Sequence, residues 1–127
     1  MYTTLLRTGA IAAAMAVIFG AFGAHKLKEV LDVAELANWE TACRYQFYHA
    51  LALLLTALLS LNHNQKHCKT AALLFGLGIL FFSGSLYLLS LRNVLNISAS
   101  WLGPITPIGG LFFISGWLRL AFAGKAD

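Results

Sequence analysis

The chain has 127 residues, of which 59% are hydrophobic and only 11% are charged, against about 25% charged residues in soluble domains. This length leaves room for one domain, covering residues 1–127. The formal charge of +4 does not indicate nucleic-acid binding, because the basic residues are scattered and the aromatic residues lie inside apolar blocks. The composition excludes an ordinary soluble domain and indicates an integral membrane protein.

Four apolar blocks approach the roughly 20 residues that a helix needs to cross a bilayer. They cover about residues 8–24, 42–61, 70–91 and 107–123. The first block resembles a secretory signal, but Phe22 is poorly suited to position −3 of a cleavage after Ala24. We therefore interpret it as a retained span, and the sequence predicts an all-α bundle of four transmembrane helices.

The segment between the first two blocks, residues 26–40, has a different pattern. Apolar residues recur in it at helical spacing, and acidic residues share another face: Leu27, Val30, Leu31 and Ala34, against Glu29, Asp32 and Glu35. This pattern predicts a short amphipathic helix along the membrane surface that ends near Trp39. A solvated linker helix is the alternative.

Positive charges give the orientation. Four spans place both termini and the 62–69 loop on one side, which carries five basic residues: Arg7, Lys66, Lys69, Arg119 and Lys125. The other side carries four: Lys26, Lys28, Arg44 and Arg92. The excess favours both termini in the cytoplasm. Because the bilayer would separate Cys43 from Cys68, we expect two free thiols.

Polar residues gather at one end of the predicted bundle, where the first and third spans end and the second and fourth begin. The candidate polar cluster consists of His25, Arg44, Tyr45, Gln46, His49, Ser83, Tyr87, Ser90 and Thr106. At 1.5 Å per residue, His49 lies about 7.5 Å deeper than Arg44, roughly halfway to the midplane. At that depth a polar side chain faces the bundle interior and needs a protein partner.

Two interpretations of this cluster stay open. Its members satisfy one another and lock the helices together, or His49 forms part of a proton relay or small-solute site. In the same region, Thr106 and Pro107 are typical of an N-cap and a first helical turn. His25 is expected to cap the end of the first span.

Metal binding and catalysis find little support. Two groups of residues could offer ligands, His25 with His49 and His63 with His67 and Cys68, but neither includes the further ligands that a structural zinc site needs. The chain shows no activated serine, no paired carboxylates in a span and no phosphate loop. We expect no metal, no cofactor and no enzymatic activity.

Small residues recur along three of the spans. They are Ala12, Ala16, Gly20 and Ala24 on the first, Ala72, Gly76 and Gly84 on the third, and Gly109 and Gly116 on the fourth. Small residues at such spacing let helices approach closely in lipid. The contacts are expected within one chain, with a homo-oligomer contact as the alternative.

Three strings of residues carry a family resemblance. Gly-Ala-Phe-Gly-Ala-His at 20–25, Tyr-Gln-x-x-His-Ala-Leu-Ala-Leu-Leu at 45–54, and Gly-Pro-Ile-Thr-Pro-Ile-Gly-Gly at 103–110 with Gly-Trp at 116–117 resemble the domain of unknown function 423 family. The resemblance implies a four-helix membrane protein of the bacterial inner membrane, or of the mitochondrial inner membrane. It brings no catalytic residues.

The sequence as a whole favours a non-enzymatic packing or assembly module. We expect it to lie in the lipid bilayer and to bind a second copy of itself or a membrane-complex partner. The alternative is a small-solute or proton pocket centred on His49. The spans are almost purely apolar on the cytoplasmic side, which favours a closed-ended pocket or a structural network over a channel.

Overall fold

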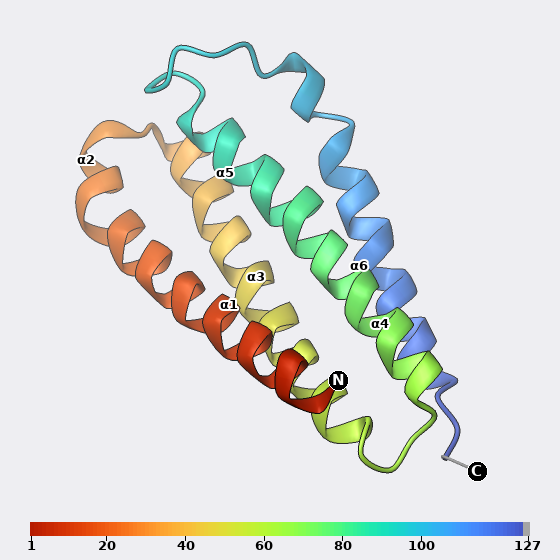
Figure 1. Cartoon of the computed structure of the whole chain (residues 1–127). Coiled ribbons are helices and arrows are strands. Elements are labelled where there is room, and N and C mark those ends of the chain that lie inside the picture. The colour runs from red at the N-terminus through yellow and green to blue at the C-terminus, as the bar shows by residue number, and fades with distance from the viewer. Residues whose placement is uncertain (126–127) are drawn as a thin grey trace.

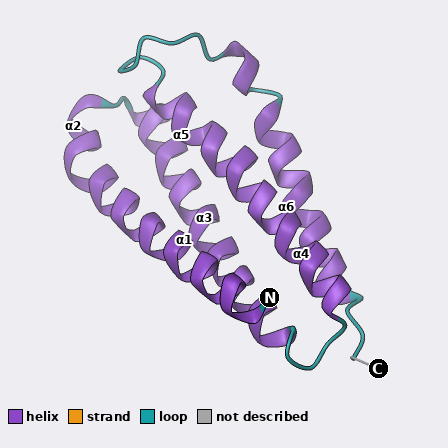
Figure 2. Cartoon of the chain, in the orientation of Figure 1, coloured by secondary structure: helices purple, strands orange, loops and turns teal. Residues whose placement is uncertain are grey.

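A computed structural model describes residues 1–125, which form helices joined by loops (Figure 2). The helices are α1 (Tyr2–Phe22), α2 (Lys28–Val30), α3 (Val33–Leu59), α4 (Gln65–Gly78), α5 (Gly84–Leu91) and α6 (Ile105–Ala121). Two π-helical turns, Gly23–Leu27 and Ile79–Ser83, and a 3₁₀ turn, Ser100–Leu102, complete them. The described chain is thus all-α.

These elements combine into four long helical rods (Figure 1). The π-helical turns join α1 to α2 and α4 to α5, so that residues 2–30 and 65–91 are each continuous. Three rods are long and apolar enough to cross a membrane: Tyr2–Val30, Gln65–Leu91 and Ser100–Ala121. The fourth, α3, is as long, but Arg44, Gln46 and His49 lower its hydropathy.

The rods lie side by side and alternate in direction (Figure 1). In the bundle α1 packs against α3, α3 against α5, and α4 against α6. The C-terminal end of the described chain lies beside the α3–α4 connection: Asn64 donates its backbone N–H to the carbonyl of Gly124 at 3.0 Å, and His63 forms a β-bridge with Lys125. The N-terminus lies at the same end of the bundle (Figure 1). The α2–α3 and α5–α6 connections lie at the opposite end.

The structure has no separate interfacial helix in residues 26–40, contrary to the sequence-based expectation. The first rod continues to Val30, the chain turns at Leu31 with φ −94° and ψ 145°, and α3 begins at Val33. Leu27 and Leu31 pack against Trp39 and Cys43 inside the bundle. Two of the four residues in the apolar stripe, Leu27 and Leu31, are therefore buried at the junction between two rods, whereas Val30 and Ala34 are exposed.

Two predicted helix ends are also wrong. Thr106 is not an N-cap, because α6 already begins at Ile105 after Pro104, whose φ of −69° suits a helix start. Pro107 is accommodated in the first turn, where a backbone N–H has no intrahelical partner. His25 does not end the first helix, since it lies within the π-helical turn Gly23–Leu27.

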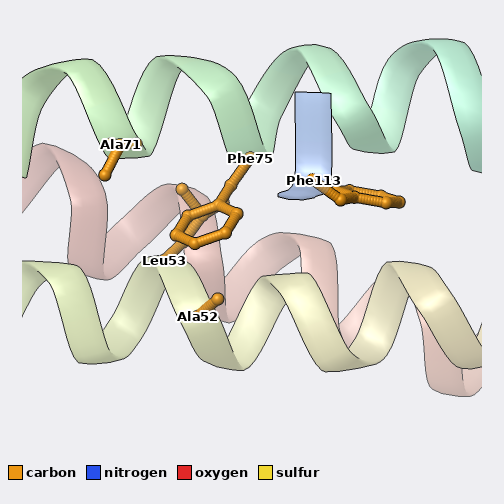
Figure 3. Packing of buried hydrophobic residues seen from close by; sticks show 6 residues of the cluster. Ala52, Leu53, Ala71, Phe75 and Phe113 are labelled. Carbon is orange, nitrogen blue, oxygen red and sulfur yellow. The ribbon is translucent and has the colours of Figure 1, made fainter. Parts of the chain in front are cut away.

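The main apolar core lies between α3, α4 and α6 (Figure 3). Its buried members are Ala52, Leu53, Ala71, Ala72, Phe75 and Phe113. The ring of Phe75 is fully buried and that of Phe113 nearly so. Alanines and glycines surround these two rings, and this is what lets the three helices approach one another.

Glycine contacts show which small residues bring helices together. A Cβ on Gly109 would collide with the backbone of Phe81 and Phe82, and one on Gly116 would lie 2.8 Å from the Phe75 ring. Three glycines outside the expected stripes are equally tight: Gly9 against Leu54, Gly23 against Trp39 and Gly78 against Phe113.

Other members of the predicted stripes lack such contacts. No described atom lies within 4 Å of a Cβ placed on Gly20 or Gly76, and only a carbonyl at 3.9 Å lies near one on Gly84. Ala16 is buried, Ala12 is half-buried and Ala24 is exposed. The spacing of four identifies one helix face, but it does not say which part of that face meets a neighbouring helix.

Candidate functional site

His49 lies on the buried side of α3 with both ring nitrogens engaged. Nδ1 is 2.7 Å from the carbonyl oxygen of Tyr45, one turn earlier in the same helix. Nε2 accepts a hydrogen bond from the indole N–H of Trp117 in α6 at 3.1 Å. Since Nε2 must be the acceptor, the proton resides on Nδ1, which donates to the carbonyl. This is a neutral imidazole held in one tautomer.

Aromatic side chains fill the space around this imidazole. The His49 ring stacks on Phe113, with centroids 3.5 Å apart and planes 9° from parallel. Phe75 lies at a centroid distance of 5.8 Å and Tyr45 at 6.1 Å. The side chains of α3, α4 and α6 therefore enclose the histidine without leaving it in an open pocket.

Gln46 connects three helices. Its side-chain amide donates to the carbonyl oxygen of Ala12 in α1 at 2.9 Å. Its amide oxygen accepts a hydrogen bond from the Tyr87 hydroxyl in α5 at 2.6 Å. The donor and the acceptor of the side-chain amide are thus both used, and Gln46 is 5% exposed.

Hydroxyl groups of the second half of the chain bond across the same region. The fully buried Ser83 donates to the carbonyl of Ala42 in α3 at 2.8 Å. Ser85 and Thr106 place their hydroxyl oxygens 2.6 Å apart and link α5 to α6. Ser90 bonds only to its own helix, at the carbonyl of Leu86.

A second set of polar contacts closes the end of the bundle that contains the α2–α3 junction. The indole N–H of Trp39 donates to the carbonyl of Phe19 at 2.8 Å. The buried Glu35 accepts a hydrogen bond from the Asn93 side chain. Asp32 accepts the Glu35 backbone N–H at 2.7 Å, and this bond holds the pKa of the Asp32 carboxyl below its ordinary value.

Not every predicted member of the cluster joins it. His25 and Arg44 are exposed, and Arg44 lines a shallow groove between α1 and α3. Tyr45 is 37% exposed and contributes its carbonyl and the face of its ring. The structure brings together Gln46 with Tyr87, and Thr106 with a serine that the sequence analysis did not select.

Sequence reasoning missed Trp117, Ser85, Glu35 and Asn93. The depth of His49 offered one signal, because a donor for it had to come from a similar depth in another span. Trp117 is an indole in the fourth apolar block, with an N–H that needs an acceptor when it faces the protein interior. For the Glu35–Asn93 contact we find no comparable signal.

Within residues 1–125 no three His, Cys, Asp or Glu side chains are grouped closely enough to hold a metal ion. Cys43 and Cys68 are free, buried thiols in this part of the chain. The polar groups of the cluster instead hydrogen bond one another or backbone carbonyls. Inside a bilayer there is no water to satisfy polar groups and no hydrophobic effect to drive helices together. Hydrogen bonds of this kind can connect the helices there.

Long apolar helices that are joined through internal polar contacts define a helical integral membrane protein. Residues 19–110 match the family described as "Protein of unknown function (DUF423)", and the chain belongs to this family. The resemblance found in its motifs is thereby confirmed.

Its relatives include bacterial proteins named as membrane proteins. A "UPF0382 membrane protein" of Staphylococcus epidermidis is 48% identical over 115 residues, which are 91% of this chain and 89% of the relative. YwdK of Bacillus subtilis, another UPF0382 membrane protein, is 42% identical over 91% of this chain and 90% of its own length. A Haemophilus influenzae relative is 39% identical over 95% and 90%. No solved structure matches the chain.

Proposed function

We propose that this protein is a non-enzymatic packing or assembly module of the bacterial inner membrane, which crosses the bilayer four times with both termini in the cytoplasm. Its polar cluster serves to fix the arrangement of the helices. A homo-oligomer or a membrane-complex partner would then bind the exposed apolar surface. The names of the bacterial relatives support the membrane address.

The hydrogen bonding of His49 carries this proposal. Both ring nitrogens are used in the neutral form, one by the Tyr45 carbonyl and one by the Trp117 indole. Protonation at Nε2 would direct a second N–H at the indole N–H and remove that bond. A group that loses its partner on protonation is suited to joining helices and poorly suited to passing protons.

The alternative is a small-solute or proton pocket centred on His49. It would need space beside the ring and a second polar group to exchange a proton with Nε2. The Phe113 ring at 3.5 Å and the Phe75 ring at 5.8 Å occupy that space. A transport role would therefore require these aromatic rings to move.

The test compares His49→Leu with Trp117→Phe. Each substitution leaves one polar atom without its partner: Nε2 of the buried His49, or the indole N–H of Trp117, which is 44% exposed. An unpaired buried polar atom costs about 1–3 kcal/mol, and we expect both substitutions to lower the melting temperature in detergent. The double variant should lose less than the sum, because neither partner is then left alone. Proton flux into proteoliposomes, measured between pH 5 and 8 for each protein, should be absent throughout.

His25→Leu is the matched control, since it removes an exposed imidazole and should leave the melting temperature unchanged. A wild-type flux that disappears in a His49→Leu protein of normal stability would contradict the proposal and support the transport pocket. Strictly additive losses in the double variant would show that His49 and Trp117 do not act as a pair.

A further inference from the structure

A large groove lies away from the polar cluster, between α1, α3 and α4. It encloses about 910 Å³. Its wall is formed mainly by aliphatic side chains. They include Leu5 of α1, Leu53 of α3, Leu73 and Leu77 of α4, and Leu80 of the π-helical turn that follows α4. Ala72 and Gly76 also line it, and a Cβ on Gly76 would meet no described atom within 4 Å. The small residues of α4 therefore leave a hollow where the sequence predicted a helix contact.

One end of this groove is basic. Lys66 and Lys69, from the first turns of α4, line it together with Gln65, and both lysines are exposed. None of the described lining residues is acidic. Of the five acidic residues in the chain, four lie in residues 29–40 at the other end of the bundle, and the fifth, Asp127, lies outside the described residues. The positive charge of the groove is thus not balanced by a neighbouring carboxylate in its wall.

The groove has the dimensions of one bilayer leaflet. From Lys66 to Leu80 a helix rises about 21 Å at 1.5 Å per residue, and half of a hydrocarbon core is about 15 Å thick. Lysines at the loop end would therefore lie at headgroup level while the leucines reach the acyl-chain region. A basic site above one apolar channel can hold the phosphate and one of the two acyl chains of a phospholipid.

From this combination we infer that the groove binds one anionic phospholipid of the cytoplasmic leaflet. Its phosphate lies against Lys66 and Lys69, and one acyl chain runs along Ala72 and Gly76 toward Leu80. The lysines select the negative charge, since a basic residue near an anionic headgroup favours binding and a zwitterionic lipid gains less. This site is independent of His49 and of the polar cluster.

Native mass spectrometry of the full chain in detergent tests the site with dioleoyl phosphatidylglycerol and dioleoyl phosphatidylcholine, which share the same tails. We expect one tightly retained phosphatidylglycerol per chain and a clear preference over phosphatidylcholine. The Lys66→Gln/Lys69→Gln protein should lose that preference by on the order of tenfold. The control, Lys26→Gln/Lys28→Gln, removes the same charge at the opposite end and should retain the preference.

The tail channel is tested separately with Gly76→Leu, which fills the hollow, against Gly20→Leu, which places the same side chain over open space elsewhere. Gly76→Leu should reduce phosphatidylglycerol occupancy, and Gly20→Leu should not. The lysine variants leave the shape of the groove unchanged, so they decide the matter even if Gly76→Leu does not fold.

Three results would overturn the inference. The first is that the wild type retains the two lipids equally. The second is that the two lysine double variants show the same preference for phosphatidylglycerol. The third is that the wild type is a dimer in light scattering and that Gly76→Leu converts it to a monomer. The last result would assign the groove to a second copy of the chain.

Discussion

Several polar residues in this bundle, Gln46 and Ser83 among them, find partners on neighbouring helices, because hydrocarbon offers them none. Gln46 donates to a backbone carbonyl of α1 and accepts a hydrogen bond from a hydroxyl of α5. Such bonds between membrane helices contribute about 0.6 kcal/mol on average. Their larger effect is on specificity, since a rotation of α3 about its axis would strand Gln46 and His49 together.

Single glycines also determine how closely two helical segments approach, and Gly109 gives the clearest prediction. Gly109→Ala should lower the stability of the protein by about 1–3 kcal/mol, because the new methyl group would meet the backbone of Phe81 and Phe82 and not a flexible side chain. Thermal unfolding in detergent measures the effect.

Gly76→Ala is the matched control, with the same substitution inside a helix. It meets no described atom within 4 Å and replaces a poor helix former by a good one. Its melting temperature should be unchanged or higher. An equal loss in both variants would show that the close contact of Gly109 with the π-helical turn Ile79–Ser83 does not set its contribution to stability.

Among the elements, α3 is the helix whose first turn is fixed by hydrogen bonds with the side chains of Asp32 and Asn93. The first rod ends at Val30, and only Leu31 and Asp32 separate it from α3. The Asp32 side chain accepts the Glu35 backbone N–H and so caps the new helix. Glu35 in turn is buried and bonded by Asn93 of the α5–α6 connection, which ties the start of α3 to a distant loop.

This cap predicts a dependence of stability on pH. The Glu35 N–H bond keeps the Asp32 pKa below its ordinary value of about 3.9. The stabilisation is therefore complete above that value and is lost as the pH falls through the lower pKa of the folded state. Asp32→Ala should melt at a lower temperature than the wild type at pH 7, and the difference should shrink below about pH 4.

Asp32→Asn supplies the control, because an amide oxygen can cap the helix without titrating. Its difference from Asp32→Ala should stay constant across the same pH range. If the wild type and Asp32→Ala differ equally at pH 3 and pH 7, the ionised carboxylate is not what stabilises the start of α3.

At the scale of the molecule, the two ends of the bundle differ in charge. The end with the termini and the α3–α4 connection carries five basic residues, and the end with the α2–α3 junction carries four. Positive charge is retained on the cytoplasmic side of membrane proteins. This supports a cytoplasmic position for the termini.

Cysteine labelling of intact cells checks this orientation. Lys28→Cys and Lys66→Cys place thiols at exposed positions at opposite ends, and we expect an impermeant reagent to label the first at once and the second only after permeabilisation. The wild type is a suitable control because Cys43 and Cys68 are buried. The reverse pattern would invert the orientation, and labelling of both from outside would contradict the crossing of the membrane by α3.

The sequence alone determined the class of the protein. Hydropathy is a property of each segment by itself, so the four apolar blocks predicted the helical rods, and the strings at 20–25, 45–54 and 103–110 indicated the family. The depth of His49 likewise followed from the helical rise, and its need for a protein partner from the absence of water in hydrocarbon.

Only the tertiary structure decided which residues are the hydrogen-bond partners of the buried polar side chains. Trp117 lies 68 residues from His49, and its approach depends on how α6 is rotated about its axis, which no local pattern records. The same rotation separates Gly109, packed on the backbone of Phe82, from Gly76, which faces an open groove. The end of the first rod at Val30 was also decided in three dimensions, because burial of Leu27 and Leu31 against Trp39 outweighs the amphipathic pattern that predicted a surface helix.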